Sequence, residues 1–196
     1  LPTDTVTNGG AGGASATGTL SVGPLDGTYP GVVAYFQQRR AYACTFNNPD
    51  TYEMSQPGRY TNFDRRSPPI GSDAITGTPW GTKVDGVQWM LPMPGGLVVL
   101  TGQSAWQLSG SGGSSFAPQA LTPSSQTAQQ QAYNGISPTV PPIQILDDIV
   151  YVQAKNSIYQ NIAYSINSNI YTGGYLTLNS SHLFTGYTTV QHCWCE

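Results

Sequence analysis

The feature that most constrains the fold is a pattern of residues that occurs three times along the chain. Each occurrence has an apolar strand, a tight turn, a very apolar second strand, another tight turn and an aromatic strand. The second strands begin at Ala41, Leu97 and Ile149, which lie 56 and 52 residues apart. A repeat of this length predicts similar structural units that pack on one another. The predicted strands are 32–36, 41–45 and 52–55, then 87–91, 97–101 and 106–109, then 143–146, 149–153 and 158–161.

The second strand of each unit is apolar at successive positions, which is typical of a strand that is covered on both faces of its sheet. We therefore predict that 97–100 and 149–152 are buried central strands. The fold class that follows is all-β, with antiparallel meander repeats that resemble the blades of a propeller. A β-sandwich is the alternative, because any all-β chain contains hairpins at loosely regular intervals.

The composition agrees with a β-protein and excludes helical bundles. Charged residues make up 9% of the 196 residues, against about 25% in an average soluble domain. The chain holds 23 Gly and 15 Pro, and its 12 Tyr outnumber its 7 Lys and Arg. Residues 124–133 (SSQTAQQQAY) come nearest to a helical pattern, and we predict either a short helix or a polar loop there.

Two regions differ in composition. Residues 1–28 are rich in Gly, Ser and Thr and poor in large apolar groups, which predicts an arm or linker. We expect 3–20 to pack little against the rest of the chain. Residues 29–196 form the predicted β domain of about three repeat units. Three units are fewer than a propeller normally needs, and 193–196 reads as the middle of a strand, so we expect an incomplete part of a larger protein.

Charge and hydropathy exclude two classes of partner. The formal net charge of −3 argues against specific nucleic-acid binding, and the basic pairs 39–40 and 65–66 are too few to change that expectation. No run of 18 apolar residues is present, so we predict no membrane span. Residues 1–13 lack the basic start and apolar core of a signal peptide.

The cysteines and histidines at the end of the chain were considered as metal ligands. His192, Cys193 and Cys195 offer up to three ligands within four residues, but a structural zinc site draws ligand pairs from separated segments. His182 or Cys44 would have to complete the set. We therefore assign no metal and no cofactor. Cys193 and Cys195 point to the same face of one strand, where a disulfide is unfavourable, and the sparse odd set indicates synthesis in a reducing compartment.

No catalytic residue is assigned. His182 follows two serines, but a Ser-His neighbour pair without an orienting third group does not make a triad. Asp147 and Asp148 are candidates for one half of a glycosidase pair, and their place between two apolar strands favours a tight turn instead. Arg65 and Arg66 beside Asp64 read as a solvated loop.

Three further motifs carry little functional weight. The Gly-rich stretch 110–113 lacks the lysine and helix pattern of a phosphate loop. Asn179 begins a glycosylation sequon, which has no use without secretion. The aromatic residues Trp80 and Tyr171 to Tyr175 suit stacking on sugars, although packing between sheets or subunits is the more common use of such side chains.

Three stretches of the chain carry recognisable motifs. The first stretch is 29–63 (YPGVVAYFQQRRAYACTFNNPDTYEMSQPGRYTNF), and the second is 87–110 (VQWMLPMPGGLVVLTGQSAWQLSG), followed by Leu-Thr-Pro at 121–123. The third runs from 149 to 186 and ends in SSHLFTG. Together these stretches resemble tail tubular, or nozzle, proteins of short-tailed bacteriophages. The resemblance covers roughly residues 29–190, and members of the family are several times longer than this chain.

This resemblance implies a structural virion component of a phage or prophage tail, without catalysis. Copies would form a ring around the DNA exit channel, beside neighbouring tail and adaptor proteins. The sparsely charged surface would let double-stranded DNA pass without specific binding. We expect residues 1–196 alone to be monomeric or weakly associated. The alternative function is a carbohydrate- or receptor-binding module of the virion. A glycosidase or depolymerase is the third and least favoured hypothesis.

Overall fold

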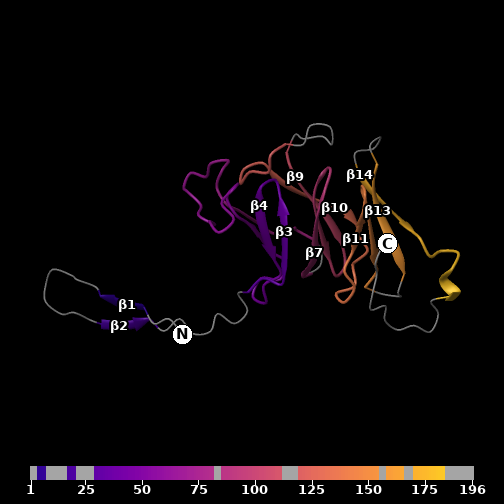
Figure 1. Cartoon of the computed structure of the whole chain (residues 1–196), viewed down its shortest axis with the longest axis horizontal. Helices are drawn as coiled ribbons and strands as arrows, with labels where there is room; N and C mark the ends of the chain where they lie inside the picture. The colour runs from indigo at the N-terminus through magenta and orange to yellow at the C-terminus, as the bar shows by residue number, and fades with distance from the viewer. Residues whose placement is uncertain are drawn as a thin grey trace.

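The three repeats fold into three antiparallel sheets of four strands each, which Figure 1 shows as successive layers. The computed structural model describes residues 4–7, 17–20, 29–81, 85–111, 119–154, 158–165 and 170–183. Nearly all regular structure in these ranges is β, with one short 3₁₀ turn, η1 (Ser181–Leu183). The prediction of an all-β, antiparallel chain is confirmed. The described part of the chain contains no helix that is long and apolar enough to cross a membrane.

Each sheet is built from one continuous stretch of chain, and each strand pairs with the strand that follows it in sequence. Sheet I contains β3 (Val32–Phe36), β4 (Arg39–Ala43), β5 (Tyr52–Met54) and β6 (Ile75–Gly77). Sheet II contains β7 (Val87–Met93), β8 (Gly96–Thr101), β9 (Ala105–Gly110) and β10 (Gln126–Ala132). Sheet III contains β11 (Ile143–Ile145), β12 (Asp148–Val152), β13 (Tyr159–Ser165) and β14 (Ile170–Tyr175).

The sequence pattern found three strands per unit, and the structure adds a fourth to each. The added strands are β6, β10 and β14. The prediction of a helix or polar loop over 124–133 is wrong, because Gln126–Ala132 forms β10 and pairs with β9 along its length. A strand at the edge of a sheet is half exposed, so its polar residues give little apolar alternation by which to recognise it.

The middle strand β8 shows why the sheets stack. All of its positions are buried, as predicted. Leu97 and Val99 belong to a core cluster shared with sheet I, whereas Val98 and Leu100 belong to a second cluster shared with sheet III. Successive side chains of a strand point to opposite faces, so one short apolar run supplies both interfaces of the central sheet. In sheet III, Ile149 and Tyr151 are fully buried in the second cluster, as predicted for 149–152.

The sheets approach one another at different strands. Sheet I lies close to sheet II through β3 and β7, whereas sheet II lies close to sheet III through β10 and β14. Over the described residues the sheets do not close into a ring. The propeller-like arrangement therefore stays a prediction. The alternative, a β-sandwich, has two packed sheets in its simple form, whereas this chain has three.

The segment after β10 fastens sheet II to sheet III through the main chain. Ile136 N donates to the carbonyl of Thr101 over 2.9 Å, and Ser137 N donates to the carbonyl of Val152 over 2.8 Å. Ile136 is buried in the second core cluster. Gly135 passes so close to the backbone of Gly102 that there is no room for a β-carbon.

Within the predicted arm, two strands were not expected from the composition. β1 (Asp4–Thr7) pairs antiparallel with β2 (Thr17–Leu20). Figure 1 draws this hairpin apart from the three sheets.

Candidate functional site

The candidate catalytic and metal-binding residues that the structure describes do not lie together at one site. His182 lies exposed in η1, Asp147 lies in the turn between β11 and β12, and Asp148 begins β12. Cys44 directly follows β4, where burial raises the pKa of its thiol. Gly110 ends β9, and Asn179 lies exposed after β14. The proposed ligands 192–195 and the Gly pair 112–113 lie outside the described residues, as does the side chain of Tyr171. Within the described part, no group of three or more His, Cys, Asp or Glu is placed to hold a metal ion.

Sheet I contains a buried guanidinium that sequence reasoning missed. The predicted strands 32–36 and 41–45 place Arg39 in the tight turn between them, and this is wrong: the turn consists of Gln37 and Gln38, and Arg39 begins β4 with only 2% of its surface exposed. Gln37 and Gln38 both adopt positive φ values, 46° and 58°. Two consecutive residues with positive φ are typical of the type I′ turn of a two-residue β-hairpin.

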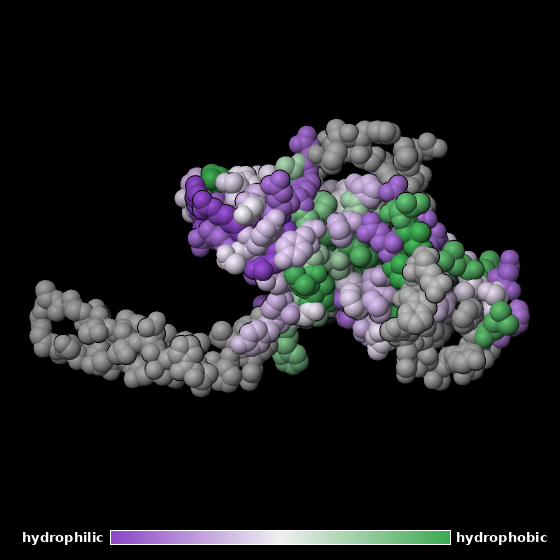
Figure 2. Space-filling model, viewed as in Figure 1, coloured by the Kyte–Doolittle hydropathy of each residue, from purple (hydrophilic) through white to green (hydrophobic). Residues whose placement is uncertain are grey.

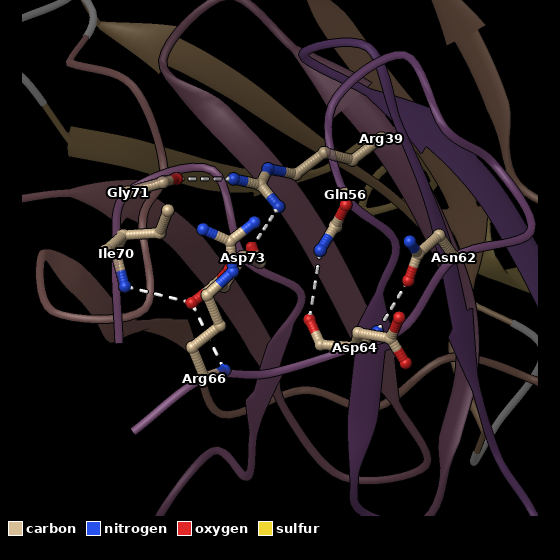
Figure 3. A network of polar contacts seen from close by, with 8 residues as sticks. All are labelled: Arg39, Gln56, Asn62, Asp64, Arg66, Ile70, Gly71 and Asp73. Carbon is tan, nitrogen blue, oxygen red and sulfur yellow. Dashed lines mark hydrogen bonds and ion pairs between the residues drawn. The ribbon is translucent and has the colours of Figure 1, made fainter. Parts of the chain in front are cut away.

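Arg39 binds the long connection between β5 and β6 at three carbonyl oxygens, and Figure 3 shows its contacts with Gly71 and Asp73. Its Nη1 donates to Ser55 O over 2.8 Å and to Asp73 O over 2.7 Å, and its Nη2 donates to Gly71 O over 2.9 Å. Burial lowers the pKa of Arg39 below its usual value, and the Asp73 carboxylate opposes that shift. The arginine thus joins both ends of the connection to β4.

Asp73 organises the same connection from the other side. Its carboxylate is fully buried, and its Oδ2 accepts hydrogen bonds from Ile70 N over 2.9 Å and from Arg66 N over 3.3 Å (Figure 3). Arg66 Nε lies 3.5 Å from Asp73 Oδ1, but the Arg66 side chain is 64% exposed, so this ion pair adds little stability. The Arg39–Asp73 network, meaning these two residues and their partners, gives the 55–74 connection a fixed path.

The 55–74 connection brings basic and aromatic groups onto sheet I. Five of the seven basic residues of the chain lie in it or in β4: Arg39, Arg40, Arg59, Arg65 and Arg66. Phe63 stacks on Tyr42 with 5.7 Å between ring centroids, and Tyr60 meets the ring of Tyr35 edge-on at 5.5 Å. Figure 2 shows hydrophilic side chains gathered over this upper left part of the molecule. Arg65 and Arg66 are exposed, as predicted for a solvated loop.

A cleft of about 390 Å³ opens between sheet I and sheet II. Its walls come from the loop before β5, the segment after β6, Asp85 before β7, the β8–β9 turn, and β9 and β10. The side chains with functional potential are Asp50, Trp80, Asp85, Trp106, Gln130 and Tyr133. Trp80 was named from the sequence as a possible sugar-stacking residue; the other five were not.

The three rings of the cleft differ in exposure. Trp80 is 91% exposed and Tyr133 84% exposed, whereas Trp106 is 6% exposed. The indole Nε1 of Trp106 donates to Ser104 Oγ over 2.8 Å, which fixes this ring as part of the wall. The cleft therefore has one rigid aromatic wall and two open aromatic rings.

The two carboxylates of the cleft, Asp85 and Asp50, differ in how firmly they are held. Asp85 Oδ2 accepts from Thr101 Oγ1 over 2.6 Å and from Gln103 N over 2.7 Å. Its second oxygen, Oδ1, has no donor among the described residues. Asp50 is half-buried and has no hydrogen-bond or ion-pair partner in that part of the chain. The cleft thus offers free acceptors at defined positions.

A smaller hollow of about 130 Å³ adjoins the cleft and shares Gln103 and Tyr133 with it. Its other walls are Gly102, Asn134, Gly135 and the two residues that follow β12, Gln153 and Ala154. We call the two hollows together the end groove. It passes from the sheet I–II interface to the sheet II–III interface, with Tyr133 between its two parts. Signals in the sequence could not have found it, because its walls are distant in the chain.

Compared with known proteins, the chain matches no protein-family model and no curated sequence.

Proposed function

We propose that the chain is a structural, non-catalytic component of a short-tailed phage or prophage tail. In the virion, copies of it form part of the ring around the DNA exit channel, in contact with neighbouring tail and adaptor proteins. The family resemblance supports this proposal. The structural observation in its favour is the stack of three similar sheets: among the described residues, the two core clusters cover both faces of sheet II and one face each of sheets I and III. A further layer on an end sheet would extend this stacking.

The outer face of sheet I has the properties of such a contact surface. Val33 and Tyr35 alternate with the buried Ala34 and are 55% and 57% exposed. At the other end of the stack, the chain after β14 exposes the apolar side chains of Leu176, Leu178 and Leu183. Contacts between one end of a copy and the other end of the next are heterologous, and such contacts close into rings when the rotation allows it. With 9% charged residues, little electrostatic repulsion opposes that association.

The location in the virion is tested by immunogold labelling and electron cryo-microscopy of particles from the source phage or an induced prophage. We expect gold at the tail and density for stacked four-stranded sheets around the tail axis. Label on the capsid alone, or particles that lack the chain, would contradict the proposal.

The contact surface is tested by placing a charge on it in the phage gene. Val33→Asp should lower the incorporation of the protein into tails, since it introduces an unpaired charge into the proposed interface. Phe46→Asp is the matched control, because Phe46 is 88% exposed and lies in the loop after β4. Equal incorporation of both variants would exclude the outer face of sheet I as the contact.

A second candidate function is a carbohydrate- or receptor-binding module of the virion. The open aromatic rings and free acceptors of the cleft favour it. A glycan array without binders would count against this candidate and leave the tail location untouched.

A further inference from the structure

We propose that the end groove is a binding site for an uncharged oligosaccharide. The inference deepens the second candidate function by naming a site and a ligand class, and it does not depend on the location of the chain in a tail. At about 390 Å³, the larger hollow falls in the range of small-ligand sites, roughly 300 to 1,000 Å³.

The open rings supply the first element of saccharide recognition. A sugar ring has an apolar face of C–H groups, which packs against the flat face of an indole or phenol ring. Trp80 and Tyr133 are among the most exposed aromatic side chains of the described chain. Exposed rings of this size normally find a partner, because their burial contributes a large apolar area at little cost in conformational entropy. Both rings border the same hollow, so one bound chain can contact both.

The acceptors supply the second element. Sugar hydroxyl groups are hydrogen-bond donors as well as acceptors, and a carboxylate is the strongest acceptor that a protein side chain offers. Asp85 is already held by Thr101 and by the backbone of Gln103, so its remaining oxygen is fixed in direction before any ligand binds. A preorganised acceptor loses less freedom on binding than a mobile one. Gln130 adds an exposed amide that both donates and accepts.

The charge of the lining decides which saccharides fit. Asp50 and Asp85 are the ionisable side chains that line the larger hollow, and no basic side chain lines either hollow in the described residues. The two carboxylates of the described lining repel uronic acids, sialic acids and phosphate groups, so this part of the lining favours neutral sugars. The partition of the groove at Tyr133 indicates at least two sugar positions, one on each side of that ring.

The proposal is tested by isothermal titration calorimetry of the full chain with chitotetraose, cellotetraose, maltotetraose and tetragalacturonate. We expect at least one neutral tetrasaccharide to bind with a dissociation constant below about 1 mM. Its monosaccharide should bind more weakly by about tenfold or more, because it occupies only one of the two positions. Tetragalacturonate should bind at least about tenfold more weakly than the best neutral ligand.

Four variants separate the groove from other surfaces. Trp80→Ala should weaken the neutral ligand about tenfold or more, and Phe46→Ala, which removes an equally exposed ring elsewhere, should leave binding unchanged. Tyr133→Ala should reduce the gain in affinity from monosaccharide to tetrasaccharide. Asp50→Asn should narrow the difference in affinity between neutral and anionic ligands, because it removes one of the two negative charges of the larger hollow. The fold should be kept, because Asp50 has no partner in the described chain.

Three results would overturn the inference. The first is the absence of binding by all neutral probes at 1 mM, with a glycan array that shows no binder. The second is equal affinity of the wild type and Trp80→Ala. The third is stronger binding of tetragalacturonate than of every neutral probe. None of these results bears on the immunogold label at the tail, so the failure of this inference and the failure of the tail proposal are distinguishable.

Discussion

Replacing Arg39 by methionine tests whether the Arg39–Asp73 network holds the connection between β5 and β6. Methionine keeps a similar apolar stem but removes the hydrogen bonds to the carbonyl oxygens of Ser55, Gly71 and Asp73. Each bond from a charged donor contributes about 1.5–3 kcal/mol net. Because the three bonds share one guanidinium, their contributions are less than additive. We therefore expect a loss of about 2–4 kcal/mol in the free energy of unfolding.

The loss is measured by urea unfolding, and the melting temperature should fall by about 6–12 °C, at about 3 °C per kcal/mol for a chain of this size. Limited trypsin digestion gives a local readout, since Arg59, Arg65 and Arg66 are exposed cleavage sites within the connection. Arg39→Met should be cut there faster than the wild type. Arg39→Lys should fall between the two, because one ammonium group does not reproduce the fork of a guanidinium.

The matched control is Arg66→Gln, which removes an ion pair whose arginine is 64% exposed and should change stability by less than about 0.5 kcal/mol. The reasoning would be refuted if Arg39→Met unfolded at the same urea concentration as Arg66→Gln, and if trypsin cut its 55–74 connection no faster than that of the wild type.

Three further predictions concern packing and pH. Leu108→Ala, in the first core cluster, should cost about 2–5 kcal/mol in urea unfolding, whereas Leu178→Ala, 72% exposed, should cost little; equal effects would contradict the assigned core. Gly135→Ala should lower the melting temperature by several degrees because its β-carbon meets the Gly102 backbone, whereas Gly71→Ala, with ordinary contacts, should not. Burial raises the pKa of Tyr52 to about 12, and it also raises that of Tyr151, so these two tyrosines should contribute no pH dependence of stability below about pH 9. Between pH 10 and 12 the unfolded chain loses these protons first, and stability should fall by up to about 1.4 kcal/mol per pH unit for each tyrosine; Tyr52→Phe should flatten the profile, and an unchanged slope would exclude the assignment.

The parts of the fold that could be predicted are those in which local sequence and final environment agree. Leu97 to Leu100 are apolar at every position, and a strand covered on both faces requires that pattern. β10 escaped prediction because Gln126–Ala132 is a half-exposed edge strand, held by main-chain pairing with β9 rather than by apolar side chains.

The site was less predictable than the fold. The burial of Arg39 could not be predicted, because the three carbonyl groups that bind it come from residues 55, 71 and 73, which meet it only after folding. The sequence indicates Trp80 as a residue suited to stacking on sugars, but its neighbours Asp50, Trp106 and Tyr133 are brought to it by the packing of two sheets. Local sequence patterns do not reveal contacts between residues that are distant in the chain.

The strict sequential order of the sheets has a consequence for how chains of this type can evolve. Each sheet is encoded by one uninterrupted stretch of chain, and its core contacts are with the adjacent sheet. A tandem duplication of the segment that encodes sheet II would therefore insert one layer and create one new interface, in which the face that packs on sheet III meets the face that packs on sheet I. The existing contacts with sheets I and III would be kept, so the number of layers can change by alteration of a single interface, as in other repeat architectures.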